Sequence, residues 1–135
     1  MDKYEVAELI VGTNLMDPKS VEATIKSILV GTGNEEAMKV VVGTSFFSDP
    51  ASSKYHLARV GGLALHSLLV LDSLIRLQDS LKLHKRVVGI DLQSMVRVAI
   101  LHDVCKIGTY KVESRNRKND VTGQWEKYNV YIKVS

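Results

Sequence analysis

The sequence predicts a mainly α-helical bundle that is followed by a C-terminal β-hairpin. Apolar residues recur at helical spacing up to Gly108, and beyond it their period changes from 3.6 to 2. The chain has 135 residues, of which 45% are hydrophobic and 24% charged, a balance typical of one globular domain. We therefore expect a single domain over 1–135, with N-terminal helices over 1–46, a core over 47–108 and the hairpin over 109–135.

Three short helices are expected before residue 46. Asp17 is a good N-cap residue and Pro18 is favoured at the first helical position, so the second helix has the clearest start. Gly31 or Gly33 should end that helix, and Asn34 should cap the third. The apolar residues that form the three helical patterns are Tyr4, Val6, Leu9 and Ile10, then Val21, Ile25, Ile28 and Leu29, then Met38, Val41 and Val42, the last three turned inward.

Two further helices are expected after the loop FFSDPASSKYHLARVGG, and the solvated connection KLHKR should separate them. The first runs from about Val60 to Leu77 and should be largely buried, because leucines cover much of its surface. Asp91 should cap the second, which leads into the stretch AILHDVCKIG.

The hairpin is predicted by two alternating segments, TYKVESR and WEKYNVYIKV, with the turn residues NDVTG between them. We expect one aromatic face of this hairpin to pack on the helices. Its aromatic residues are Tyr110, Trp125, Tyr128 and Tyr131.

Composition excludes several classes of protein. The first residues lack the apolar stretch of a secretory signal, and no uncharged apolar run approaches the roughly 18 residues of a membrane-spanning helix. A single cysteine, Cys105, rules out an internal disulfide framework and suits the cytoplasm. The net charge of +3 permits an anionic partner without establishing one.

Three polar residues in apolar helical segments could carry chemistry. His66 lies in GGLALHSLLVLDSLIRL, and His102 and Asp103 lie in AILHDVCKIG. Ionised aspartate is rarely buried unless it is paired or coordinates a metal, and imidazole with carboxylate suits Mn²⁺, Fe²⁺, Ni²⁺ or Zn²⁺. In the alternative reading, Asp103 bonds a backbone amine or an arginine such as Arg97, and both histidines are core residues.

These two segments resemble the motifs of the HD-domain metal-dependent phosphohydrolases. LALHSLLV resembles that superfamily's first-histidine helix, and AILHDVCKIG its His-Asp helix. The likeness covers roughly Phe46 to Gly108 and is greatest to HD-domain nucleases and phosphohydrolases with a similar loop and a Gly-Gly pair before the first histidine. It implies an HD-like helical bundle, of which this chain would be the N-terminal portion.

The resemblance implies a role for each motif residue. His66, His102 and Asp103 would bind a divalent metal (Mn, Fe, Ni, Zn or Mg), and Lys106 would contact a substrate phosphate. Lys106 could instead complement a helix dipole. His56 and Arg59 would contact phosphate or transfer protons, or be ordinary loop residues. Cys105 should be a small buried residue, unless its thiol lies near the metal.

The superfamily's closing aspartate is missing from the pattern. The only aspartate after Asp103 is Asp120, in the hairpin turn, where turn chemistry explains it. We therefore expect the fourth ligand to come from a complementing C-terminal segment or from another subunit of a homo-oligomer, or metal binding to be weak.

Two functions follow from these patterns. The first is metal-dependent hydrolysis of a nucleotide, a cyclic nucleotide or a nucleic-acid 3′ end. The second is a catalytically inactive, regulatory or assembly module that binds nucleotide or RNA through Arg115, Arg117 and Lys118 of the hairpin. A purely structural helical protein would leave Asp103 unexplained.

Overall fold

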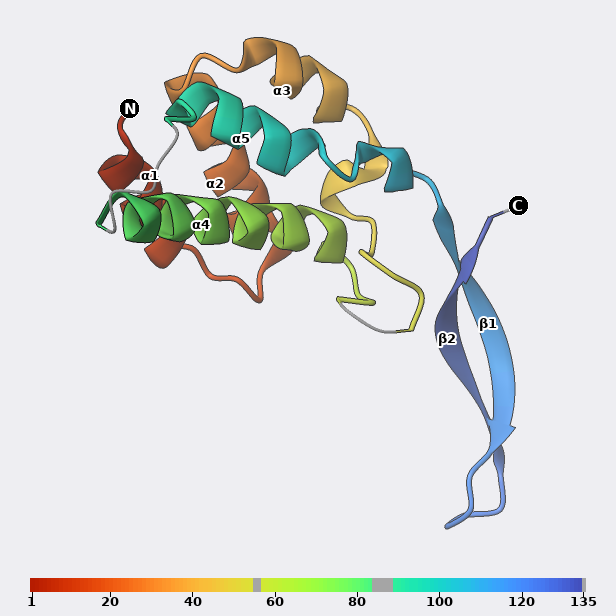
Figure 1. Cartoon of the computed structure of the whole chain (residues 1–135). Coiled ribbons are helices and arrows are strands. Elements are labelled where there is room, and N and C mark those ends of the chain that lie inside the picture. The colour runs from red at the N-terminus through yellow and green to blue at the C-terminus, as the bar shows by residue number, and fades with distance from the viewer. Residues whose placement is uncertain (55–56, 84–88, 135) are drawn as a thin grey trace.

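Helices account for most of the chain before residue 108, and a two-stranded hairpin follows them (Figure 1), which confirms the predicted fold class. The structure, a computed structural model, describes residues 1–54, 57–83 and 89–134. The helices are α1 (Lys3–Val11), α2 (Pro18–Gly31), α3 (Glu35–Val41), α4 (Gly62–Leu83) and α5 (Leu92–Leu101), with short 3₁₀ turns η1 (Ser45–Phe47) and η2 (Val104–Lys106). The strands are β1 (Tyr110–Lys118) and β2 (Trp125–Lys133).

The first two helices begin at aspartate caps. Asp2 accepts a hydrogen bond from the backbone N–H of Glu5, and the carboxylate of Glu5 accepts one from the backbone N–H of Asp2, so α1 starts with a capping box. Asp17 accepts from the N–H of Lys19, and Pro18 occupies the first position of α2 as predicted.

Asn34 precedes α3 but does not cap it through its side chain. The side chain is buried, where its amide donates to Thr32 and to the carbonyl of Gln93 and its oxygen accepts from Arg97. Asn34 therefore ties α3 to α5. The prediction that Val42 turns inward is wrong, because α3 ends at Val41 and Val42 is extended and 45% exposed.

The long helix α4 is at the centre of the core. Leu63, Leu68 and Leu71 are fully buried, and α4 packs on α5, α2 and α1. Its second half is more exposed, so the expected burial holds mainly for the first half. Neither α4 nor any other helix in the described ranges combines the length and apolar character needed to cross a membrane.

The Gly-Gly pair before α4 is required by the backbone around it. Gly61 has a φ of +78°, which strains any other residue. A Cβ on Gly62 would lie 2.0 Å from the carbonyl oxygen of Leu57. That carbonyl accepts hydrogen bonds from the N–H groups of Ala51 and Arg59, so it cannot easily move. As a result, α4 begins at Gly62, two residues after the predicted start, and extends to Leu83.

The hairpin pairs in a regular antiparallel register, from Tyr110 opposite Lys133 to Lys118 opposite Trp125. It projects from the helices (Figure 1), and Trp125 is 72% exposed. The prediction that an aromatic face packs on the helices is therefore wrong for most of its length. The base is anchored, because the buried carboxylate of Asp49 accepts from the N–H of Gly108 at 2.8 Å.

We expect Leu68→Ala to lower the free energy of unfolding by about 2–5 kcal/mol, because it leaves a cavity between α4 and its neighbours. Leu77→Ala is the matched control, since Leu77 lies on the same helix and is 56% exposed. Its effect should stay below about 1 kcal/mol in urea unfolding. Equal losses for the two variants would contradict this description of the core.

Burial and the nearby negative charge of Asp49 raise the pKa of Tyr131 above its ordinary value. The folded state then keeps a proton that the unfolded state loses near pH 10, so stability should fall as the pH rises through and above that value. Asp49→Asn should lower the pKa of Tyr131 by removing the charge. Absorbance at 295 nm, with Tyr131→Phe subtracted, measures this, and titration of Tyr131 at or below pH 10 would count against it.

Candidate metal centre

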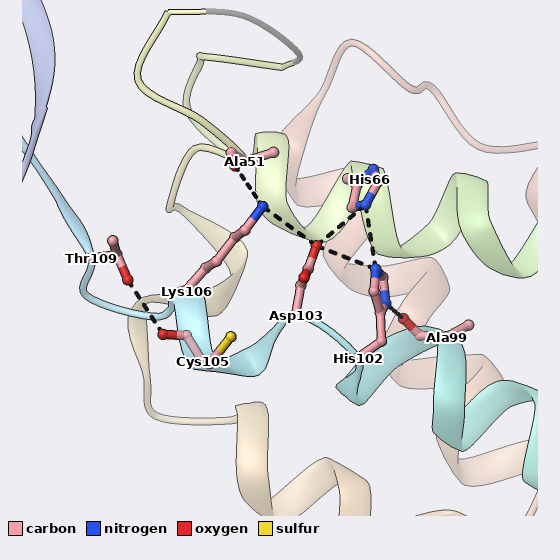
Figure 2. Close-up of polar contacts among 8 residues, drawn as sticks. All are labelled: Ala51, His66, Ala99, His102, Asp103, Cys105, Lys106 and Thr109. Atoms are coloured by element: carbon pink, nitrogen blue, oxygen red, sulfur yellow. Dashed lines mark hydrogen bonds and ion pairs between the residues drawn. The ribbon is translucent and has the colours of Figure 1, made fainter.

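Packing of α4 against α5 brings three ligand atoms together (Figure 2). His66 lies in the second turn of α4, His102 is the C-cap residue of α5, and Asp103 follows it. The Nε2 atoms of the two histidines are 3.3 Å apart. The Oδ2 atom of Asp103 lies 3.3 Å from Nε2 of His66 and 3.2 Å from Nε2 of His102. The three atoms therefore form a nearly equilateral triangle.

This triangle has the size that a metal ion requires, so the three residues could hold one. A point equidistant from the three atoms lies about 1.9 Å from each, close to the 2.0–2.2 Å of zinc bonds to histidine and carboxylate. Three protein ligands with one open position is also the usual donor set of catalytic zinc sites. The triad therefore offers this number of protein ligands and leaves one position for a further ligand.

The orientation of His102 favours metal binding. Its Nδ1 lies 2.7 Å from the carbonyl oxygen of Ala99. Because a carbonyl can only accept, Nδ1 carries the proton of this hydrogen bond, and in the neutral ring the lone pair is on Nε2, toward His66 and Asp103. Metal-binding histidines commonly have such a backbone partner on the other ring nitrogen.

The end of α5 differs from the expected continuous His-Asp helix. The helix stops at Leu101, and Asp103 has φ −115° and ψ 18°, outside helical geometry. The chain leaves the helix at Asp103, before η2 begins. This departure brings the side chains of His102 and Asp103 together. The alternative pairing of Asp103 with Arg97 is absent, since the guanidinium of Arg97 donates to Asn34.

The triad is accessible without being fully exposed. The side chains of His66, His102 and Asp103 are 24%, 30% and 19% exposed. An ion or a small phosphate could reach these atoms from solvent, while partial burial limits the competition from water. Asp103 is thus a partly buried carboxylate beside two imidazoles, as its sequence setting indicated.

Lys106 lies at the edge of the triad. Its Nζ is 3.7 Å from Oδ2 of Asp103 and donates to the carbonyl of Ala51 at 3.3 Å (Figure 2). It is the last residue of the single 3₁₀ turn η2 and the basic residue of that turn. Cys105 is exposed, and the prediction that it is a small buried residue is wrong, because η2 turns its side chain outward.

The other predicted site residues do not join the triad in the described parts of the chain. The guanidinium of Arg59 donates to the carbonyl of Leu15, in the connection between α1 and α2. His56 lies outside the described residues. Arg115, Arg117 and Lys118 are on the projecting hairpin, and Asp120 lies in its turn at the far end (Figure 1).

Two groups that support the site were not found from the sequence. One is Asp49, whose carboxylate accepts from Ser45 and from Gly108, fixing the loop that precedes α4 beside the segment that follows Lys106. The other is the pair of backbone carbonyls that hold His102 and Lys106, at Ala99 and Ala51. A sequence does not show which backbone carbonyls accept hydrogen bonds from side chains, because every residue has one. The only signal for Asp49 was its position in the loop before Pro50.

Comparison with known proteins finds no matching family, no matching curated protein and no matching solved structure. The site geometry therefore carries the functional argument.

The triad predicts a metal site that depends on Asp103. In isothermal titration with Zn²⁺ or Mn²⁺, the chain should bind one ion, and Asp103→Asn or His66→Ala should weaken binding at least tenfold, about 1.4 kcal/mol. Asp120→Asn is the matched control, because Asp120 lies in the hairpin turn. Unchanged affinity in Asp103→Asn, or an equal loss in Asp120→Asn, would exclude this site.

Proposed function

We propose that the chain is a metal-dependent phosphohydrolase of the HD class that acts on a nucleotide, a cyclic nucleotide or a nucleic-acid 3′ end. One observation carries the proposal: two imidazole nitrogens and a carboxylate oxygen lie within 3.3 Å of one another, with a lysine ammonium 3.7 Å from that carboxylate. The order of the motifs along the chain, with the Gly-Gly pair before the first histidine, supports the choice of class.

His66, His102 and Asp103 would hold the ion, which by its ligand set is Mn²⁺, Fe²⁺, Ni²⁺ or Zn²⁺ in preference to Mg²⁺. When bound, a divalent ion polarises a phosphoryl oxygen and lowers the pKa of water. Asp103 offsets part of the ionic charge, and Ala99 holds His102 in the tautomer that binding requires. A second copy or another segment of the chain could add a carboxylate at the open side.

Lys106 would bind the substrate phosphate. Its ammonium is held between Asp103 and the carbonyl of Ala51, and its side chain is 37% exposed. An anionic phosphate can therefore replace the weak contact with Ala51 without the lysine leaving the triad. As a point charge, Lys106 then offsets the negative charge that the phosphate brings toward Asp103.

An open groove beside the triad could take the part of the substrate that does not react. It runs from His66 along α4 and has a volume of about 330 Å³. Its lining is mostly apolar, from Leu69, Val70, Leu74 and Leu77, and also includes Ser73. A nucleoside has apolar ring faces and a few polar atoms, and these match the mostly apolar lining of the groove. Such substrates are abundant in the cytoplasm, where we place the protein.

We expect the chain with Mn²⁺ to hydrolyse bis-p-nitrophenyl phosphate, a substrate whose leaving group departs without protonation. Asp103→Asn should lower kcat/KM at least a hundredfold, because it removes a ligand and a charge at the metal. Lys106→Ala should lower it about tenfold or more, with partial recovery in Lys106→Arg. Release of nitrophenolate measures the rate.

Lys39→Ala is the control for the lysine, since Lys39 lies on α3 and is 73% exposed. A chain that binds the ion with the expected dependence on Asp103 but gives no metal-dependent turnover would contradict the proposed reaction. Metal binding and hydrolysis are thus tested separately.

A further inference from the structure

The two faces of the hairpin differ in charge. Opposite residues in the register share a face, and each strand alternates between faces. The side chains of one face, named here the lysine face, include three lysines and no carboxylate; they are Tyr110, Val112, Ser114, Asn116 and Lys118 of β1 and Trp125, Lys127, Asn129, Tyr131 and Lys133 of β2. The other face has three basic and two acidic residues: Lys111, Arg115, Arg117, Glu113 and Glu126.

The opposite face satisfies most of its own charges. Arg117 forms an ion pair with Glu126 at 2.9 Å and lies over the ring of Tyr128, 4.9 Å from its centroid. Arg115 lies 4.0 Å from Glu113. The two arginines that the sequence suggested for nucleic-acid binding are therefore already engaged within the hairpin.

The outer end of the lysine face is charged and exposed. Lys118, Lys127 and Lys133 form no ion pair with any residue in the described ranges. At the outer end of this face, Asn116, Lys118 and Lys127 are exposed and Trp125 is 72% exposed. The indole of Trp125 therefore lies in solvent on the same face as the ammonium groups of Lys118 and Lys127.

The chemistry of this outer end indicates its ligand. Single-stranded nucleic acid is bound by cations that contact the phosphates and by aromatic rings on which bases stack. Lys118 and Lys127 flank Trp125 on one face, and the amides of Asn116 and Asn129 lie beside them to bond base edges. A duplex would hide its base faces from Trp125, and an acidic peptide would not use the ring in stacking.

We propose that the lysine face of the hairpin binds single-stranded nucleic acid, with Lys118 and Lys127 on the phosphates and a base stacked on Trp125. This surface is separate from the metal triad and requires no ion. It goes beyond the proposed hydrolysis, and it places binding on the opposite side of the hairpin from Arg115 and Arg117.

The test uses the whole chain with EDTA and fluorescein-labelled dodecamers of uridine (RNA) and thymidine (DNA), which separate the two sources of ligand. Anisotropy should report binding of at least one, and the fluorescence of Trp125, the sole tryptophan, should change with it. Lys118→Ala or Lys127→Ala should weaken binding several-fold and reduce the slope of log affinity against log salt by about 0.7. Trp125→Ala should weaken it about fivefold or more, and Trp125→Phe, which keeps a stacking ring, less.

Lys111→Ala is the matched control, because Lys111 is an exposed hairpin lysine on the opposite face. It should leave affinity within about twofold of the original, since a single non-contacting charge acts only through screened solvent. The proposal is overturned if Lys111→Ala costs as much as Lys127→Ala, if neither oligonucleotide binds, if binding leaves the fluorescence of Trp125 unchanged, or if duplex DNA or polyglutamate competes equally well. Persistence of binding in Asp103→Asn separates this result from the fate of the metal site.

Discussion

The apolar packing of α4 against α5 determines the rest of the structure. His66 and His102 are 36 positions apart in the sequence and meet only because these helices bury Leu68, Ala99 and Ile100 in a common core. The burial of such side chains contributes about 1.5–3 kcal/mol for each large one, far more than a partly exposed pair of imidazoles could contribute. The polar triad is thus positioned by its apolar surroundings.

Much of the fold could be predicted because its signals are local. Asp17 and Asp91 accept from nearby N–H groups as capping residues should, and the alternation after Gly108 gives the two strands. The wrong predictions concern positions whose structure depends on residues distant in the sequence. The side chain of Asn34 does not cap α3, because it bonds to Gln93 and Arg97, some 60 positions later. The apolar ring of Trp125 predicts a position in the core, but the hairpin projects from the helices and leaves the ring in solvent.

The candidate site was predictable in its residue types and less so in its geometry. The two motifs singled out His66, His102 and Asp103, and the structure brings these three side chains together as a group that could hold a metal ion. The helix end at Leu101 was not visible, because no glycine or proline marks it. The division of the hairpin charges also depends on register, which places Arg117 against Glu126 and leaves Lys127 on the other side. Spacing alone shows a basic segment without showing which cations are already paired.

The bond from Nδ1 of His102 to Ala99 has a consequence for the history of the chain. The last carbonyls of a helix lack partners within it, and this imidazole satisfies one of them at the end of α5. The same ring therefore terminates a helix and presents a ligand atom. A related chain that bound no metal would still gain stability from a histidine here, whereas the side-chain partners of Asp103 are the two imidazoles of the triad and the ammonium of Lys106. Among related chains, an aspartate at this position would therefore be a better marker of metal binding than the histidine before it.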